Sequence, residues 1–177
     1  MGIFKTILIV LVVVIVAILA LAATKPDEFR VQRQTTIKAP PEKIFNVLND
    51  FHQFGAWSPW EKLDPAMKRT LSGAEKGKGA TYAWVGNSQA GEGRMEILES
   101  TPSSKIVVKL DFIKPFEGHN QTEYLLQPKG DSTTLIWSMS GPTPFVSKIM
   151  QVFVSMDSLI GKDFEEGLAN LKALTEK

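Results

Sequence analysis

The stretch that decides the fold is TTIKAPPEKIFNVLND, which runs from Thr35 to Asp50. It completes a segment, residues 29–39, in which apolar and polar side chains alternate, and this period of two predicts a half-buried strand. Two consecutive prolines then interrupt the alternation, and proline is well tolerated in the first turn of a helix. The apolar residues between Ile44 and Leu48 recur at helical spacing. We therefore expect a strand that is followed directly by a short amphipathic helix.

A second short helix is expected over residues 51–54, and an aromatic loop follows it. The stretch FGAWSPWEKLDP (54–65) carries Trp57 and Trp60, which are two of the four tryptophans in the chain. Its glycine and prolines argue against a regular helix through this stretch. Two large rings in a loop either fill the core or line a ligand site. Both interpretations stay open here, because the wall of a cavity is also packing.

Downstream of this loop the chain changes to strands. Short apolar segments are separated by turns that are rich in Gly, Pro, Asn and Ser. The expected strands are 67–71, 80–85, 93–101, 105–113, 121–127 and 133–140. Strands joined by such short turns pair antiparallel, because parallel neighbours need a long crossover connection.

The last part of the chain has a helical pattern. From Phe145 to Leu174 apolar residues recur at helical spacing, which predicts one helix of about 30 residues. Gly161 and Gly167 are positions at which this helix could bend. A sheet and a helix that each have one apolar face must cover one another. The expected fold class is therefore α+β, with a curved antiparallel sheet of about six to seven strands around a long C-terminal helix, and two short helices after the first strand.

The N-terminal residues form a separate unit. Ile7 to Ala23 reads ILIVLVVVIVAILALAA and contains no polar side chain. As a helix it would span roughly 25 Å, close to the ~30 Å hydrocarbon core of a bilayer. A cleaved signal peptide is the alternative, because residues 20–22 fit an A-x-A cleavage site, but the apolar run exceeds the usual h-region of about 7–15 residues. We therefore expect a retained transmembrane helix and a single-pass membrane protein.

These features divide the chain into an N-terminal transmembrane anchor over 1–24, a linker over 25–29 and one globular domain over 30–177. Basic residues after the anchor outnumber those before it, which by the positive-inside rule favours a cytoplasmic domain. Those later charges alternate along the first predicted strand, so they could belong to the fold instead. The side of the membrane on which the domain lies therefore stays open.

The composition excludes several classes of function. Basic and acidic residues number 20 and 19, so there is no basic excess for a nucleic-acid surface. The sequence has no cysteine, which removes disulfides, thiolate nucleophiles and zinc–thiolate sites. His119 and Glu123 would lie about 13 Å apart along a strand at ~3.3 Å per residue, which is too far for one metal ion. We expect neither a metal nor another cofactor.

Five stretches carry a resemblance to a known superfamily. They are TTIKAPPEKIFNVLND (35–50), FHQFGAWSPW (51–60), GKGATYAWVG (77–86), GEGRMEILES (91–100) and STTLIWSMSG (132–141). Their order along residues 29–177 resembles the START/Bet v 1-like superfamily, also called SRPBCC, and within it the polyketide cyclase/dehydrase and lipid-transport branch. The resemblance implies a helix-grip fold. Members of this superfamily carry lipids, bind hormones and quinones, cyclise polyketides or regulate chaperones, so the fold alone does not settle the function.

The resemblance and the strand pattern together predict a cavity. A curved sheet around a single helix leaves a space in its middle, and inward side chains from several strands could line it. Ligand pockets are mostly apolar with a few polar groups, and Met and aromatic side chains accommodate varied ligands. The candidate cavity residues are Trp57, Trp60, Tyr82, Trp84, Met95, Leu110, Phe112, Trp137, Met139, Phe153 and Met156. The alternative is that these side chains form a fully packed core.

The expected function is a membrane-anchored binding or carrier domain for a hydrophobic small molecule, such as a lipid, a quinone or a polyketide-like compound. An anchor suits this function because apolar ligands partition into the bilayer. Two alternatives remain. One is a cyclase or dehydratase that uses the same cavity, with His52 as the first candidate for proton transfer. The other is a protein-binding module with a vestigial cavity. The sequence does not indicate the oligomeric state.

Overall fold

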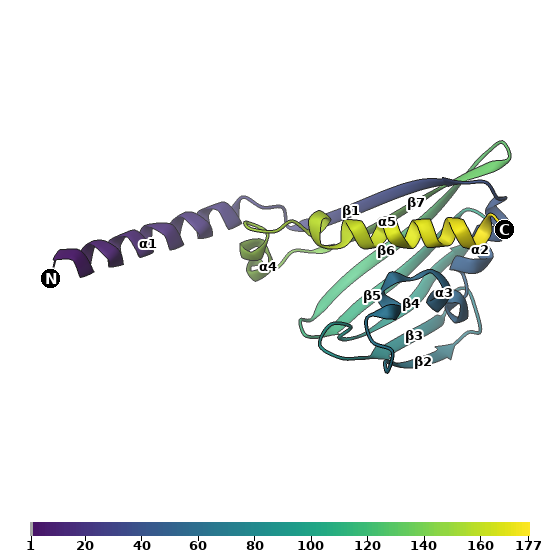
Figure 1. Ribbon diagram of the computed structural model, residues 1–177, viewed down its shortest axis with the longest axis horizontal. Coiled ribbons are helices and arrows are strands. Elements are labelled where there is room, and N and C mark those ends of the chain that lie inside the picture. The colour runs from purple at the N-terminus through teal and green to yellow at the C-terminus, as the bar shows by residue number, and fades with distance from the viewer. Residues whose placement is uncertain (1) are drawn as a thin grey trace.

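The computed structural model describes residues 2–177 and contains a seven-stranded sheet with helices on one side of it (Figure 1). The strands are β1 (Glu28–Ile37), β2 (Lys68–Gly73), β3 (Ala80–Val85), β4 (Glu92–Thr101), β5 (Lys105–Lys114), β6 (Gly118–Lys129) and β7 (Ser132–Pro142). The α-helices are α1 (Gly2–Ala23), α2 (Pro41–Leu48), α3 (Phe54–Trp57), α4 (Phe145–Met150) and α5 (Met156–Thr175). Two 3₁₀ helices, η1 (Phe51–Gln53) and η2 (Pro59–Lys62), flank α3.

All neighbouring strands of the sheet are antiparallel, in the order β1-β7-β6-β5-β4-β3-β2. From β2 to β7 each strand pairs with the next one along the chain. β1 pairs with β7, from Glu28 opposite Pro142 to Ile37 opposite Thr133. This arrangement brings the first strand of the domain beside the last one, next to α5. The predicted curved antiparallel sheet around a C-terminal helix, with short helices after the first strand, is confirmed.

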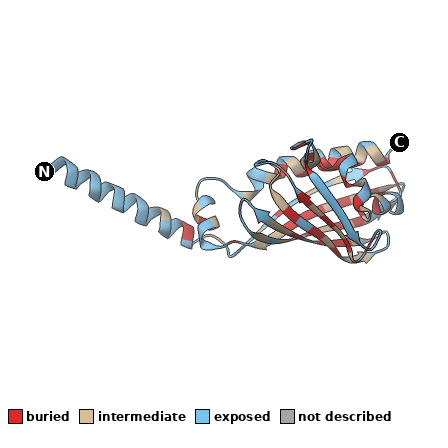
Figure 2. Ribbon diagram, turned by 90° about the horizontal axis from the view of Figure 1, so that it is seen from below, coloured by how far each residue is buried: buried red, intermediate tan, exposed pale blue. Residues whose placement is uncertain are grey.

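The core lies between the inner face of the sheet and α5, which runs across that face (Figure 1). Phe164, Leu168 and Leu171 recur at helical spacing on α5 and are buried. Ile44 and Phe45 on α2 are buried against the same core. Figure 2 shows the buried residues along the strands and on α5, whereas most of α1 is exposed. The alternating pattern of the strands therefore specifies which face is covered.

The C-terminal helix is shorter than the sequence pattern predicted. One helix was expected from Phe145 onward, but α4 ends at Met150 and α5 begins at Met156. Ser155 caps α5, because its hydroxyl accepts a hydrogen bond from the backbone N–H of Ser158 at 3.1 Å. Asp157 lies in the first turn, where the helix dipole favours an acidic side chain. The prediction of one continuous helix was wrong, because apolar spacing alone does not reveal an internal cap.

The two glycines of α5 permit close packing and do not interrupt the helix. α5 continues through both positions. The guanidinium of Arg33 lies against Gly161, and a Cβ atom at Gly167 would come within 2.8 Å of the ring of Trp137. Both positions therefore exclude a larger side chain because another residue occupies the space.

Gly167→Ala is expected to lower the free energy of unfolding by about 1–3 kcal/mol, since the added methyl group must displace the ring of Trp137. The change would otherwise favour the helix by roughly 1 kcal/mol, because alanine has the higher helix propensity. Urea melts of the detergent-solubilised protein measure the difference. Ala169→Gly, at an exposed position of the same helix, is the control for propensity alone. A stabilised Gly167→Ala variant would contradict the packing assigned to this position.

Among residues 2–177, α1 is the one helix that is long and apolar enough to cross a membrane. Its length and composition are the basis of this statement, and a signal sequence near an N-terminus has the same properties. Ala22, close to its C-terminal end, is fully buried. In Figure 1 the rest of α1 projects away from the domain.

Candidate functional site: a cavity between the sheet and α5

A cavity of about 390 Å³ lies between the inner face of the sheet, η2 and the N-terminal half of α5. This volume falls at the small end of the ~300–1,000 Å³ that small-molecule sites occupy. Its polar lining residues are Glu61, Gln89, Asn120, Thr122 and Asp163. The remaining lining residues are Phe54, Trp60, Leu63, Met67, Tyr82, Trp84, Ala90, Met95, Leu110, Phe112, Tyr124, Trp137, Met139, Met156 and Ile160. The wall is therefore mainly aromatic and aliphatic, with a few polar groups.

The structure places most of the predicted cavity residues on this wall. They are Trp60, Tyr82, Trp84, Met95, Leu110, Phe112, Trp137, Met139 and Met156. Trp57 and Phe153 are not among the lining residues. Trp57 is buried in the core, where its ring meets that of Trp137 edge to face at a centroid distance of 5.5 Å. Phe153 lies in the turn between α4 and α5 and is 69% exposed, because the helix that was expected to turn it inward ends at Met150.

Strand alternation explains why the sheet supplies so much of the wall. Tyr82 and Trp84 are two residues apart on β3, so both point to the inner face. Trp84 is opposite Gly93 in the register of β3 and β4, and its ring occupies the space that a side chain at Gly93 would need. The indole N–H of Trp84 donates a hydrogen bond to the backbone carbonyl of Ala90 at 3.0 Å. This bond holds the β3–β4 loop at the edge of the cavity.

Trp60 connects the two elements, η2 and α5, that cover the cavity on the side opposite the sheet. Its indole N–H donates a hydrogen bond to Oδ2 of Asp163 at 3.2 Å, which joins η2 to α5. Its ring packs edge to face against Trp137 and Phe164, at centroid distances of 5.7 and 6.1 Å. Trp60 therefore has one apolar side towards the cavity and one polar contact at its border, as tryptophans at such borders commonly do.

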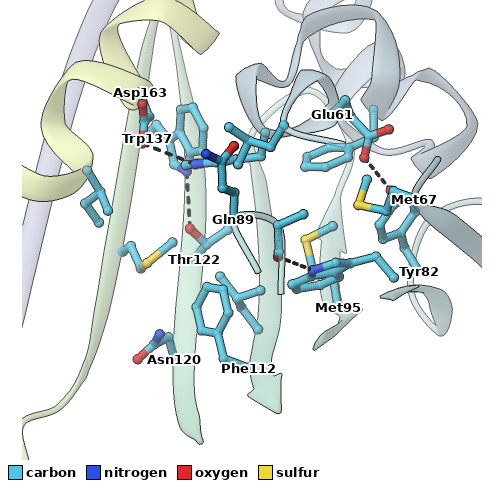
Figure 3. Close-up of a pocket in the computed structure, with 18 of the residues that line it drawn as sticks. Glu61, Met67, Tyr82, Gln89, Met95, Phe112, Asn120, Thr122, Trp137 and Asp163 are labelled. Atoms are coloured by element: carbon cyan, nitrogen blue, oxygen red, sulfur yellow. Dashed lines mark hydrogen bonds between the residues drawn. The ribbon is translucent and has the colours of Figure 1, made fainter. Parts of the chain in front are cut away.

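A buried carboxylate joins η2 to the sheet. Glu61 accepts a hydrogen bond from the hydroxyl of Tyr82 (Figure 3). It accepts another from Nε of Arg69 at 2.6 Å. Burial, reinforced by the hydrogen bond to Glu61, raises the pKa of Tyr82 well above its usual range. The hydroxyl of Tyr82 therefore keeps its proton and acts as a donor. Arg69 balances the charge of Glu61, so the carboxylate at the cavity wall is not an unpaired charge.

Thr122 and Tyr124 are two polar side chains of β6 that line the cavity. Oγ1 of Thr122 accepts a hydrogen bond from the indole N–H of Trp137 at 3.2 Å (Figure 3). Its hydroxyl donates to the backbone carbonyl of Ser138 at 3.1 Å. Tyr124, two residues further along, is only 6% exposed and also lines the cavity. Burial alone raises the pKa of Tyr124 well above its usual range. The cavity wall thus contains a phenol that keeps its proton.

The histidines lie away from this cavity. His52 is not a lining residue, its side chain is 54% exposed, and its Nδ1 lies 2.8 Å from Oδ1 of Asp50. His119 lies on the outer surface, with its Nδ1 2.8 Å from Oδ1 of Asp111. Within residues 2–177, no group of three His, Cys, Asp or Glu side chains could hold a metal ion. The ionisable groups that face the cavity are Glu61, Asp163 and the two tyrosines.

The polar lining residues were not among the predicted cavity residues. The alternation of β6 places Thr122 and Tyr124 on the face of Leu126, so period two could have identified them. Glu61 and Asp163 gave no such signal. Charged residues in a loop and on a helix are usually solvated. Only the approach of η2 to β2, β3 and α5 brings these two carboxylates to the cavity.

Comparisons with known proteins identify the fold. The solution structure of the Aha1 dimer from Colwellia psychrerythraea has a TM-score of 0.61 and 16% identity, over 84% of this chain and 96% of that one. Protein CV1439 from Chromobacterium violaceum has a TM-score of 0.58 and 17% identity, over 86% of this chain and 99% of that one. The di-domain ARO/CYC BexL from the BE-7585A biosynthetic pathway has a TM-score of 0.61 and 14% identity, over 89% of this chain and 53% of that one. At such identities these likenesses concern the fold alone.

The comparison of sequences identifies the family. A search of curated proteins finds no match. Residues 28–176 match the family described as "Polyketide cyclase / dehydrase and lipid transport". This match spans the whole of the sheet, the cavity and α5, up to the last helical turn. The chain therefore belongs to the polyketide cyclase/dehydrase and lipid-transport family of the SRPBCC superfamily.

Proposed function

We propose that this protein binds a hydrophobic small molecule in the cavity between the sheet and α5, and that α1 holds it at a membrane. The observation that carries the proposal is the mainly apolar 390 Å³ cavity, whose wall includes the protonated phenol of Tyr124. The membership of a family that includes lipid transport supports the same class of ligand. α1 supports the membrane location by its length and composition.

The cavity restricts the ligand further. A volume of about 390 Å³ favours one ring system or one acyl chain over a two-chain phospholipid. Asp163 accepts a hydrogen bond only from Trp60 and has no cationic partner among residues 2–177, so an anionic ligand would meet an unbalanced negative charge. The phenol of Tyr124 is a donor for a carbonyl or hydroxyl oxygen. The proposed ligand is therefore neutral, largely apolar and oxygen-bearing, as a quinone is.

Tryptophan fluorescence tests this proposal. Titration of the detergent-solubilised protein with 2-methyl-1,4-naphthoquinone is expected to quench the emission of Trp60, Trp84 and Trp137, because all three border the cavity. Palmitate, which carries a carboxylate, is expected to bind more weakly than hexadecanol, which has the same chain length. The proposal fails if none of these compounds changes the fluorescence.

Tyr124→Phe separates the polar contact from the apolar one. The variant is expected to bind the naphthoquinone about three- to tenfold more weakly, since one hydrogen bond contributes ~0.5–1.5 kcal/mol. Binding of naphthalene, which has no oxygen, should not change. The stability of the protein without ligand should change little, because the ring is retained and burial, without a hydrogen bond, is the cause that raises the pKa of this hydroxyl. An equal loss of affinity for both compounds would contradict the role of the phenol as a ligand donor.

A cyclase or dehydratase activity is a second candidate, and the cavity-facing carboxylates favour it. Such an enzyme needs an ionisable group within hydrogen-bond reach of its substrate. Glu61 and Asp163 line the cavity, whereas His52 does not. This candidate predicts that Asp163→Asn abolishes turnover of a polyketide substrate while binding is retained. If the parent protein turns over no polyketide substrate, and Asp163→Asn lowers ligand affinity and stability together, the enzyme candidate is contradicted and only the binding function remains.

A further inference from the structure

Exposed apolar side chains gather at one end of the domain. They are Ile113, Phe116, Phe145, Val146, Met150 and Phe153, which we call the apolar end surface. Phe116 is 76% exposed and Val146 is 72% exposed. Large apolar side chains that are exposed singly are common, but several at one end of a domain indicate an interaction site.

This end is the one at which α1 joins the domain. β1 begins at Glu28, directly after α1, and Glu28 lies opposite Pro142 at the end of β7. Because the sheet is antiparallel, β5 ends and β6 begins at the end of the sheet where β7 ends. Phe116 in the β5–β6 loop therefore lies at this end of the domain. Figure 1 shows α4 between α1 and the sheet, and the β5–β6 loop at the same end of the domain. The opposite end carries α2 and the C-terminus.

Specific contacts fix α4 beside the end of α1. Nζ of Lys148 on α4 lies 2.5 Å from Oδ1 of Asp27, and the side chain of Lys148 is only 11% exposed. The backbone N–H of Thr143 donates a hydrogen bond to the backbone carbonyl of Asp27 at 2.7 Å. Ala22 is fully buried at the same junction. The segment from Pro142 to Phe153 is therefore held at a defined position relative to the last turn of α1.

We propose that the apolar end surface rests on the lipid bilayer in which α1 is embedded. The proposal depends on the membrane location of α1 given under the proposed function. α1 has 22 residues and would span ~33 Å as a helix, about the thickness of the hydrocarbon core. Its last residue, Ala23, then lies at the boundary between hydrocarbon and headgroups. Asp27 and Lys148 lie at headgroup level, and Val146, Met150 and Phe153 meet the lipid.

The bilayer explains this surface better than a protein partner does, because the surface is continuous with the membrane-spanning helix. A partner protein would have to cover a surface that packs beside the end of α1, through the contact of Lys148 on α4 with Asp27. The bilayer also relates the surface to the cavity. Met156, which lines the cavity, follows Phe153 by three residues, so the cavity has one wall next to the membrane. An apolar ligand could then pass between bilayer and cavity without crossing water.

Lipid quenching of single labels tests the proposal. The chain has no cysteine, so Val146→Cys, Phe153→Cys and Phe116→Cys each give one site for an NBD dye. All three side chains are exposed, so the labels should not disturb the fold. Asp131→Cys, in the β6–β7 turn at the opposite end, is the matched control outside the membrane, and Val13→Cys reports on α1 itself. The full chain is reconstituted in phosphatidylcholine vesicles with or without acyl-chain nitroxide lipid.

The expected result is a blue-shifted emission that nitroxide lipid quenches at positions 13, 146 and 153, weaker quenching at 116, and none at 131. Quenching at 13 without any at 146 and 153 would overturn the docking proposal while the anchor stands. A blue shift at 146 and 153 without quenching would also overturn it, because a second copy or another protein would then cover the surface. No quenching at 13 would remove the anchor and the docking together. Quinone titration in detergent does not depend on any of these outcomes, so it reports separately on the cavity.

Discussion

Phe164→Ala is expected to lower the free energy of unfolding by about 3–5 kcal/mol. The side chain of Phe164 is fully buried, and its ring stacks on that of Trp137 at a centroid distance of 4.0 Å and an interplanar angle of 9°. Removal of the ring leaves a void between α5 and β7 that the stacked indole cannot fill without moving. Urea melts of the detergent-solubilised protein measure the effect.

Leu159→Ala is the control on the same helix. Leu159 is 51% exposed, so its truncation should change the stability by less than about 0.5 kcal/mol. A loss below about 1 kcal/mol for Phe164→Ala would mean that this face of α5 does not close the core.

Substitutions of Trp57 and Trp60 are expected to have different effects, the first mainly on stability and the second mainly on ligand affinity. Trp57 is buried in the core and is not a lining residue of the cavity, so Trp57→Ala is expected to lower the free energy of unfolding by about 3–5 kcal/mol. Trp60 is half-buried and lines the cavity. Trp60→Ala should therefore cost less stability than Trp57→Ala but weaken binding of 2-methyl-1,4-naphthoquinone by about tenfold or more.

Both variants are measured by urea melts and by quenching of the remaining tryptophans. If Trp60→Ala loses as much stability as Trp57→Ala and keeps its affinity for 2-methyl-1,4-naphthoquinone, both rings are core residues. Trp60 would then not contact the ligand, which would contradict its place on the cavity wall.

The sheet was predictable because its strands obey a simple period. β3 alternates between buried and less buried positions, and inward residues of β3, β5 and β7, such as Tyr82, Leu110 and Trp137, line the cavity. A buried face requires an apolar side chain at every second position, so the sequence carries this information locally. The position of the cavity followed from the same faces.

The helix boundaries were less predictable, because a cap depends on one or two polar residues. Ser155 begins α5 through its hydroxyl, although the apolar spacing continues across it. Phe153 was therefore predicted to line the cavity, whereas it lies in an exposed turn. The sequence Ser155-Met156-Asp157 does fit a helix start, with a capping serine and an acidic residue in the first turn. The apolar pattern of residues 145–174 continues across this helix start, so the spacing alone does not reveal it.

The polar part of the site depends on contacts between distant segments. Glu61 meets Arg69 and Tyr82, and Trp60 meets Asp163 across 103 positions of the sequence. No local pattern predicts such pairs, because they arise only when η2 folds over the sheet. Trp57 and Trp60 illustrate the same limit, since the sequence alone did not reveal which ring belongs to the core and which to the cavity.

Native mass spectrometry of the full chain, purified in detergent, tests the central claim most directly. The cavity is expected to retain a neutral apolar compound of one ring system or one chain, seen as a mass added to the protein and released as a single species on activation. Filling the cavity with Met95→Trp should remove this added mass, because Met95 lies on its wall. A bare protein mass under mild conditions, together with unchanged fluorescence on addition of quinone or hexadecanol, would contradict the claim that the cavity is a ligand site.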